Sequence, residues 1–124
     1  MGKEEIVLVA TSSWVEALRS RGDEAVRERV FKLMTEARAA VCDLVLVELW
    51  NGARGAYEKR KLSELEKEIT CFETTREVWN TARALARKCR QAGETVPTAA
   101  LIISACAVTY RAGIEHCDAH IDTI

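Results

Sequence analysis

Residues that mark loops and membrane segments are scarce in this sequence. Its 124 residues include a single Pro and six Gly, so long structureless stretches are not expected. The longest apolar run near the start, Ile6–Ala10, has five residues, whereas a signal-peptide core needs about seven and a membrane-spanning helix about twenty. We therefore expect neither a leader nor a membrane anchor.

Charge and cysteine content argue against two further classes of protein. The formal net charge is −1, so any binding of a polyanion needs a local cluster of cations. The five cysteines form an odd set without a C-x-x-C pair, which argues against a zinc site and a disulfide scaffold. Most lie in apolar runs, so we expect reduced, buried thiols and a cytoplasmic protein. They are Cys42, Cys71, Cys89, Cys106 and Cys117.

The composition is that of one globular domain over residues 1–124, with 48% hydrophobic and 30% charged residues. Four short apolar segments are expected to be strands, at residues 6–10, 41–42, 69–72 and 114–117. Helices are expected from Trp14 and over residues 23–37, 43–49, 58–68, 74–92, 99–110 and 118–124. This alternation predicts an α/β fold of three layers, α/β/α, with a small, mostly parallel central sheet.

Local signals place the ends of these helices. The expected N-terminal caps are Thr11, Ser12 or Ser13, then Asp23, Asp43, and Thr74 or Thr75. Gly93 and Gly113 are expected to end two helices. Residues 45–49 fit a strand as well as a helix. One helix should bury an apolar stripe made of Val26, Val30, Leu33 and Ala37.

Two acidic residues and two alanines fall where an open parallel sheet places its ligand site, at the carboxyl ends of its strands. Residue 10 ends the first strand and Asp118 follows the last, while Glu48 and residue 100 lie near the starts of two helices. Glu48 has apolar neighbours, where an unpaired carboxylate is costly; a solvated helix residue is the alternative. Asp118 is equally suited to capping a helix.

Four segments in the right order resemble one family. Residues 6–18 are similar to an opening that normally reads Val-Asp-Thr-Ser, and residues 47–54 to a Glu-Leu-x-x-Gly-Ala helix. Residues 93–107 are similar to Val-Pro-x-x-Asp-x-x-Ile-Ala, and residues 116–122 to a terminal Asp-x-x-Phe segment. Together they span nearly the whole chain and resemble PIN-domain ribonucleases of the VapC kind, the toxins of type II toxin–antitoxin pairs.

This resemblance implies an endoribonuclease that depends on Mg²⁺ or Mn²⁺, acts on RNA, is silenced by a cognate antitoxin and forms a homodimer. The implied catalytic and metal-binding positions are Ala10, Glu48, Ala100 and Asp118, with Asp122 as a further candidate and Thr11 and Ser12 as auxiliary contacts. The family carries Asp where this chain has Ala10 and Ala100. With two of four carboxylates missing, we expect weak or absent metal binding and an inactive enzyme.

Both differences exchange Asp for Ala while the surrounding motifs keep the family pattern. That favours deliberate substitution over natural degeneration. The rival function is a naturally degenerate PIN-fold module that binds RNA or a protein partner. A receiver-like signalling domain is disfavoured, because no acidic pair follows the first strand.

Several surface residues keep two interpretations. Candidate RNA contacts are Arg54, at the rim of the site, and Arg83, Arg87 and Arg90, for which a solvated helix face is the default. The helices at 23–37 and 58–68 are candidate antitoxin surfaces. His116 and His120 lack a nearby partner set and are not expected to be catalytic. Trp14, Trp50 and Trp79 are expected to be core or partner contacts rather than platforms for base stacking.

Overall fold

A computed structural model describes residues 5–124, and its centre is a four-stranded sheet. The strands are β1 (Val7–Val9), β2 (Ala39–Cys42), β3 (Thr70–Phe72) and β4 (Gly113–Glu115). They follow the order β3-β2-β1-β4, and each neighbouring pair is parallel. The α/β prediction is confirmed, and the sheet is parallel throughout.

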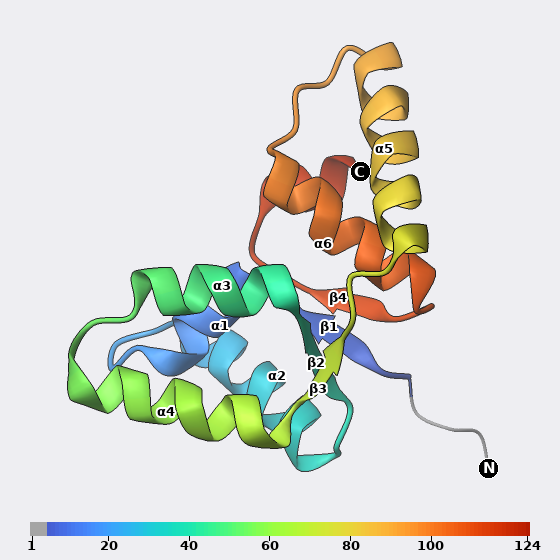
Figure 1. Cartoon of the computed structure of the whole chain (residues 1–124). Helices are drawn as coiled ribbons and strands as arrows, with labels where there is room; N and C mark the ends of the chain where they lie inside the picture. Colours follow the sequence, from blue (N-terminus) through green and yellow to red (C-terminus); the bar gives the residue numbers. More distant parts are fainter. Residues whose placement is uncertain (1–4) are drawn as a thin grey trace.

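Helices cover the sheet on both sides (Figure 1), with α5 and α6 on one side and α1 and α2 on the other. Their bounds are α1 (Thr11–Leu18), α2 (Glu24–Thr35), α3 (Asp43–Gly52), α4 (Gly55–Glu68), α5 (Arg76–Gln91), α6 (Thr98–Thr109) and α7 (Ala119–Thr123). Every residue of α6 from Ala100 to Ala107 is buried, as the all-round apolar sequence predicted. Trp14, at 1% exposure, fills the core beside β1.

Two of the predicted caps are confirmed. Asp23 accepts a hydrogen bond from the Val26 N–H at 3.2 Å, and Thr75 accepts one from the Val78 N–H at 3.4 Å. The caps proposed at Thr11–Ser13 and at Asp43 are wrong, because α1 begins at Thr11 and α3 at Asp43. The hydroxyls of residues 11–13 are therefore free to make tertiary contacts.

Four further boundaries differ from the sequence prediction. Ala37 is exposed beyond the end of α2 with φ 57°, so it does not extend the buried stripe. Gly113 is the first residue of β4, and the left-handed residue after α6 is Arg111 with φ 54°. The last strand ends at Glu115 rather than residue 117, and α4 starts at Gly55, three residues earlier than expected.

All five cysteines are free. The expectation of burial holds for Cys42, Cys89 and Cys106 and fails for Cys71 and Cys117, which are exposed. Across residues 5–124, the helices are all too short or too polar to span a bilayer.

Candidate functional site at the carboxyl edge of the sheet

The central feature of the site is the turn at which β1 passes into α1. Ala10 forms this turn with 1% of its surface exposed. Its backbone N–H donates to the carbonyl oxygen of Glu115 at 2.9 Å. Because β1 and β4 are parallel neighbours, this bond holds the chain after both strands at one edge of the sheet.

Glu48 reaches this turn from α3. The Thr11 hydroxyl donates to Oε1 of Glu48 at 2.6 Å, a contact between residues 37 positions apart. Glu48 is half-buried between the exposed Val47 and the buried Leu49, so it lies at the border of the apolar face of the helix. A hydrogen bond of this kind compensates the burial of a carboxylate.

The chain after β4, which carries Asp118, is held against the same turn. The Cys117 N–H donates to the Ser12 hydroxyl oxygen at 2.9 Å, which holds this segment against α1. Asp118 caps α7, because its carboxylate accepts from the His120 N–H at 2.9 Å. The capping interpretation of Asp118 is therefore confirmed, and the cap leaves a second carboxylate oxygen.

His116 has partners that the sequence did not predict. Its Nδ1 accepts from the Asp118 N–H at 3.2 Å, and its Nε2 lies 3.2 Å from Oδ1 of Asp122. The expectation that His116 lacks a partner set is wrong. The Asp122 side chain is 75% exposed, and its described contact is with this imidazole.

Ala100 lies in the first turn of α6 with 3% of its surface exposed. Helix α6 packs against α3, which carries Glu48, and against α7, which Asp118 caps. Figure 1 shows the start of α6, helix α3 and the connection from β4 to α7 around the same edge of the sheet. The four motif positions thus lie on elements that meet there.

A hydrogen-bond network around Glu115 supports this edge and was missed by the sequence analysis. Its carboxylate accepts from the Ser13 hydroxyl at 2.9 Å and from Arg29 Nε and Nη2 at 2.9 and 3.1 Å. Hydrogen bonding to Glu115 and its charge raise the pKa of Arg29. The available signal was an acidic residue at the end of a short apolar strand.

These residues do not fit a divalent metal ion. Within residues 5–124 no group of three or more His, Cys, Asp or Glu side chains is placed to hold one, whereas Mg²⁺ prefers about six oxygen ligands. Ala10 and Ala100 present methyl groups, and Thr11 already bonds one oxygen of Glu48. The PIN-domain ribonucleases that the sequence resembles generally use divalent metals, whereas residues 5–124 place no such ligand group at this edge.

The candidate RNA-contact arginines lie outside this cluster. Arg54 precedes α4 and is exposed, and its backbone N–H donates to Glu58 at 2.9 Å. No contact recorded for residues 5–124 joins it to Glu48 or Asp118. Arg83, Arg87 and Arg90 are exposed on α5, which packs on α6 rather than on the site.

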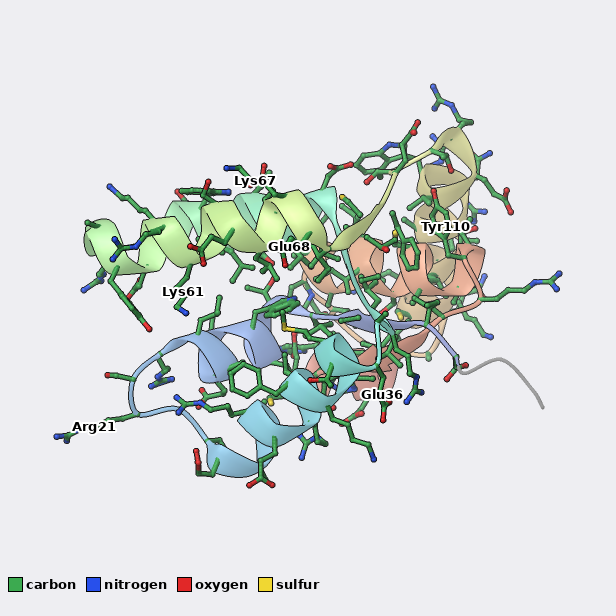
Figure 2. The ribbon with its side chains drawn as sticks, turned by 90° about the horizontal axis from the view of Figure 1, so that it is seen from below. Arg21, Glu36, Lys61, Lys67, Glu68 and Tyr110 are labelled. Atoms are coloured by element: carbon green, nitrogen blue, oxygen red, sulfur yellow. The ribbon has the colours of Figure 1, made fainter. Side chains whose placement is uncertain are left out.

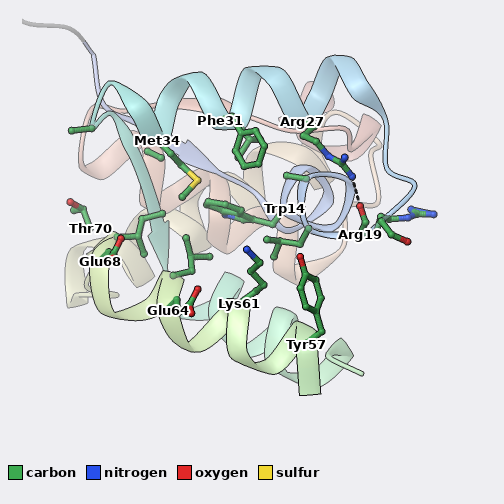
Figure 3. A pocket seen from close by; sticks show the side chains of 18 residues that line it. Trp14, Arg19, Arg27, Phe31, Met34, Tyr57, Lys61, Glu64, Glu68 and Thr70 are labelled. Carbon is green, nitrogen blue, oxygen red and sulfur yellow. Dashed lines mark hydrogen bonds between the residues drawn. The ribbon is translucent and has the colours of Figure 1, made fainter. Parts of the chain in front are cut away.

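A groove of about 830 Å³ lies between α1, α2 and α4 (Figure 3). Phe31 and Met34 of α2 line one wall, Tyr57 and Lys61 of α4 line the other, and Trp14 of α1 lines the floor. Figure 2 shows Lys61 directed into the space between α4 and the helices opposite. Both helices that the sequence offered as partner surfaces therefore border one groove.

Comparison with known proteins identifies the class of fold. The PIN-domain family model matches residues 7–124. FitAcB from Neisseria gonorrhoeae superposes with a TM-score of 0.76 and 18% identity, over 95% of this chain and 92% of that one. VapBC2 from Rickettsia felis, bound to a DNA fragment from its promoter, superposes with a TM-score of 0.72 and 17% identity, over 88% of this chain and 84% of that one. The chain belongs to the PIN-domain family.

Within that family its sequence relatives are VapC ribonucleases. VapC ribonuclease Mb1587 of Mycobacterium bovis is 32% identical over 123 residues, covering 96% of this chain and 91% of the relative. Ribonuclease VapC11 of Mycobacterium tuberculosis has the same identity and coverage. The resemblance inferred from four short motifs is thereby confirmed.

Proposed function

We propose that this chain is a VapC-like toxin of a toxin–antitoxin pair whose endoribonuclease site is disabled by Ala10 and Ala100. The observation that carries the proposal is at the carboxyl edge of the sheet, where two of the four motif positions are methyl groups, 1% and 3% exposed. Glu48 and Asp118 supply only two of the four carboxylates of the motif, so the affinity for Mg²⁺ or Mn²⁺ should be low. The ribonuclease names of the mycobacterial relatives support RNA as the substrate of an intact site.

The remaining polar residues have positioning roles in this proposal. Thr11 orients Glu48, and Ser12 holds the backbone that leads to Asp118. His116 steadies the same segment through the Asp118 N–H. These contacts do not involve a metal, so the scaffold of the site is built while part of its ligand set is missing.

The groove supports an antitoxin as the protein partner. Phe31, Met34 and Tyr57 expose 55%, 41% and 60% of their surfaces beside it, a degree of apolar exposure typical of a binding surface. An amphipathic partner helix can lay its apolar face against side chains of this kind. Structures similar in fold include complexes of VapBC toxin–antitoxin systems.

Restoration of both carboxylates tests the enzymatic proposal. We expect Ala10→Asp/Ala100→Asp to cleave RNA in the presence of Mg²⁺ or Mn²⁺ and to arrest growth on expression. Cleavage should be lost in EDTA, and both effects should be lost when Glu48→Gln is added. The chain as written should do neither. Metal-dependent cleavage by the unrestored chain would show that the two alanines do not disable the site.

The same restored variant tests the groove. Co-expression of the cognate antitoxin should relieve growth arrest, and Phe31→Asp/Met34→Asp should abolish that relief while cleavage persists. Val108→Asp is the matched control, since Val108 is 59% exposed and lies outside the groove. Equal loss of relief in the control would exclude the groove as the binding surface.

A second candidate function is favoured by one observation, the intact groove beside an incomplete metal site. In that case the chain is a binding module that captures a partner without cleaving RNA. The restored variant separates the two functions, because a binding module would stay inactive after restoration and would still bind its partner through the groove.

A further inference from the structure

Helix α5 carries a row of arginines along its outer face. The row, called here the α5 arginine face, consists of four exposed residues, Arg76, Arg83, Arg87 and Arg90. At about 100° per residue, they fall within roughly 60° of arc, on the side of the helix opposite the buried Val78 and Cys89. Fourteen residues separate its ends, or about 21 Å along the helix axis.

The charge on this face is not neutralised within the described part of the chain. None of the four guanidinium groups takes part in an ion pair there. Arg83 donates to Asn80 on its own helix. Glu77 is the one acidic residue of α5, and it projects about 100° away from Arg76. A chain with net charge −1 therefore concentrates positive charge on one ridge.

An exposed aromatic ring borders the same row. Trp79 is 43% exposed and lies about 60° round the helix from Arg76. Of the two roles expected for it, the core role does not hold and the partner-contact role remains. Figure 1 places α5 on the outer side of α6, away from the carboxyl edge of the sheet. The face is thus separate from Glu48 and Asp118.

A row of unpaired arginines beside an exposed indole favours some kinds of partner over others. Guanidinium groups bind phosphates with two parallel hydrogen bonds, and a strand with stacked bases presents one phosphate about every 3.4 Å, so the row can follow several phosphates in sequence. An indole offers an unpaired base a stacking surface that accepts any of the four bases. A second copy of the chain docked by this same face would set arginine against arginine. An acidic peptide would pair with the cations and leave the indole without a specific role.

We propose that the α5 arginine face, with Trp79, is a docking surface for single-stranded RNA, which it holds by its phosphates and by one stacked base. The surface lies apart from the cleavage centre and needs no metal ion. This inference goes beyond the proposed function and does not depend on restored cleavage or on the groove. The RNA-docking proposal and the proposed function can therefore fail independently of each other.

The test uses the chain as written and a fluorescein-labelled single-stranded RNA of about 20 nucleotides, a length that exceeds one binding surface of this size. Anisotropy titrations over a range of NaCl concentrations should give a slope of log affinity against log salt near −3, at about −0.7 per phosphate contact. Arg83→Glu/Arg87→Glu should roughly halve this slope and weaken binding about tenfold or more at 0.1 M salt.

Arg21→Glu/Arg60→Glu is the control with the same change of net charge, because both residues are exposed on other elements. It should bind RNA almost as well as the unaltered chain. Trp79→Ala should weaken binding about fivefold or more without changing the salt slope, and Trp79→Phe should retain most of the affinity. Circular dichroism verifies that every variant is folded.

Three results would overturn the proposal. Equal weakening in the control would mean that net charge alone attracts RNA. An unchanged affinity of Trp79→Ala for RNA would show that no base stacks on Trp79. Binding of a poly-glutamate peptide through the α5 arginine face, without binding of RNA, would assign the surface to an acidic protein segment.

Discussion

Removal of the Glu115 carboxylate should weaken the edge of the sheet on which the site is built. Its side chain is 12% exposed and accepts from Ser13, which is fully buried, and from Arg29, whose side chain is 51% exposed. The hydrogen bond from the buried hydroxyl to a charged acceptor contributes about 1.5–3 kcal/mol. The pair with the half-exposed arginine contributes about 0.5–1 kcal/mol, because solvent screens it.

Glu115→Ala should therefore lower the free energy of unfolding by about 2–4 kcal/mol. Arg29→Ala should cost no more than about 1 kcal/mol. The loss in free energy of unfolding for Ser13→Ala should fall between these two values, because the substitution removes the buried hydroxyl donor and leaves the Arg29 pair of Glu115 in place.

Urea unfolding followed by tryptophan fluorescence measures these differences, and the buried Trp14 reports on the adjacent core. A double-mutant cycle between Glu115→Ala and Arg29→Ala isolates the energy of their pair. The reasoning is refuted if Arg29→Ala costs as much as Glu115→Ala, or if Glu115→Ala costs less than about 1 kcal/mol. Either result would mean that the buried Ser13 bond is not the dominant contribution.

Two further predictions concern buried charge and thiol ionisation. Ala10→Asp/Ala100→Asp places two carboxylates at positions 1% and 3% exposed, so in EDTA it should be less stable than the unaltered chain by about 2–4 kcal/mol. Mg²⁺ at 100 times its Kd should raise the free energy of unfolding of this variant by about 2.7 kcal/mol. A melting temperature that does not change with Mg²⁺ would contradict metal binding by the restored site. Although Cys71 is exposed, partial desolvation of its thiol and then the charge of Asp43 raise its pKa from 9.0 to about 11. The folded thiol should therefore react slowly with iodoacetamide at pH 8 and faster toward pH 11, as followed by peptide mass spectrometry, with the urea-unfolded chain as the reference. Because the folded pKa is raised, the contribution of Cys71 to stability is present below pH 9 and is lost as the pH rises toward 11. Equal alkylation rates of folded and unfolded chain at pH 8 would contradict the shift.

The elements that carry the candidate site were predictable from sequence, whereas the contacts between them were not. Strand ends and motif spacing placed residues 10, 48, 100 and 118 on elements that meet at one edge, since parallel strands bring their carboxyl ends together. The Thr11–Glu48 bond joins residues 37 positions apart, and the Ser13–Glu115 bond joins residues 102 apart. No local pattern encodes such pairs.

The errors in local structure have the same origin. Thr11, Ser12 and Ser13 are typical capping residues, yet the helix begins at Thr11, three residues before the predicted Trp14, because the chain turns at the buried Ala10. Gly113 is the residue that favours a left-handed conformation, yet Arg111 adopts it and Gly113 pairs with Val7 in the sheet. Tertiary packing decided both boundaries.

The order of strands in the sheet has a consequence for biosynthesis. β1 lies between β2 and β4, although β4 follows it by roughly a hundred residues. While the polypeptide emerges from the ribosome, one edge of β1 must stay unpaired until β4, the last strand of residues 5–124, has been made. The segment carrying Asp118 docks against Ser12 only then, so a nascent or truncated product cannot assemble this corner of the molecule.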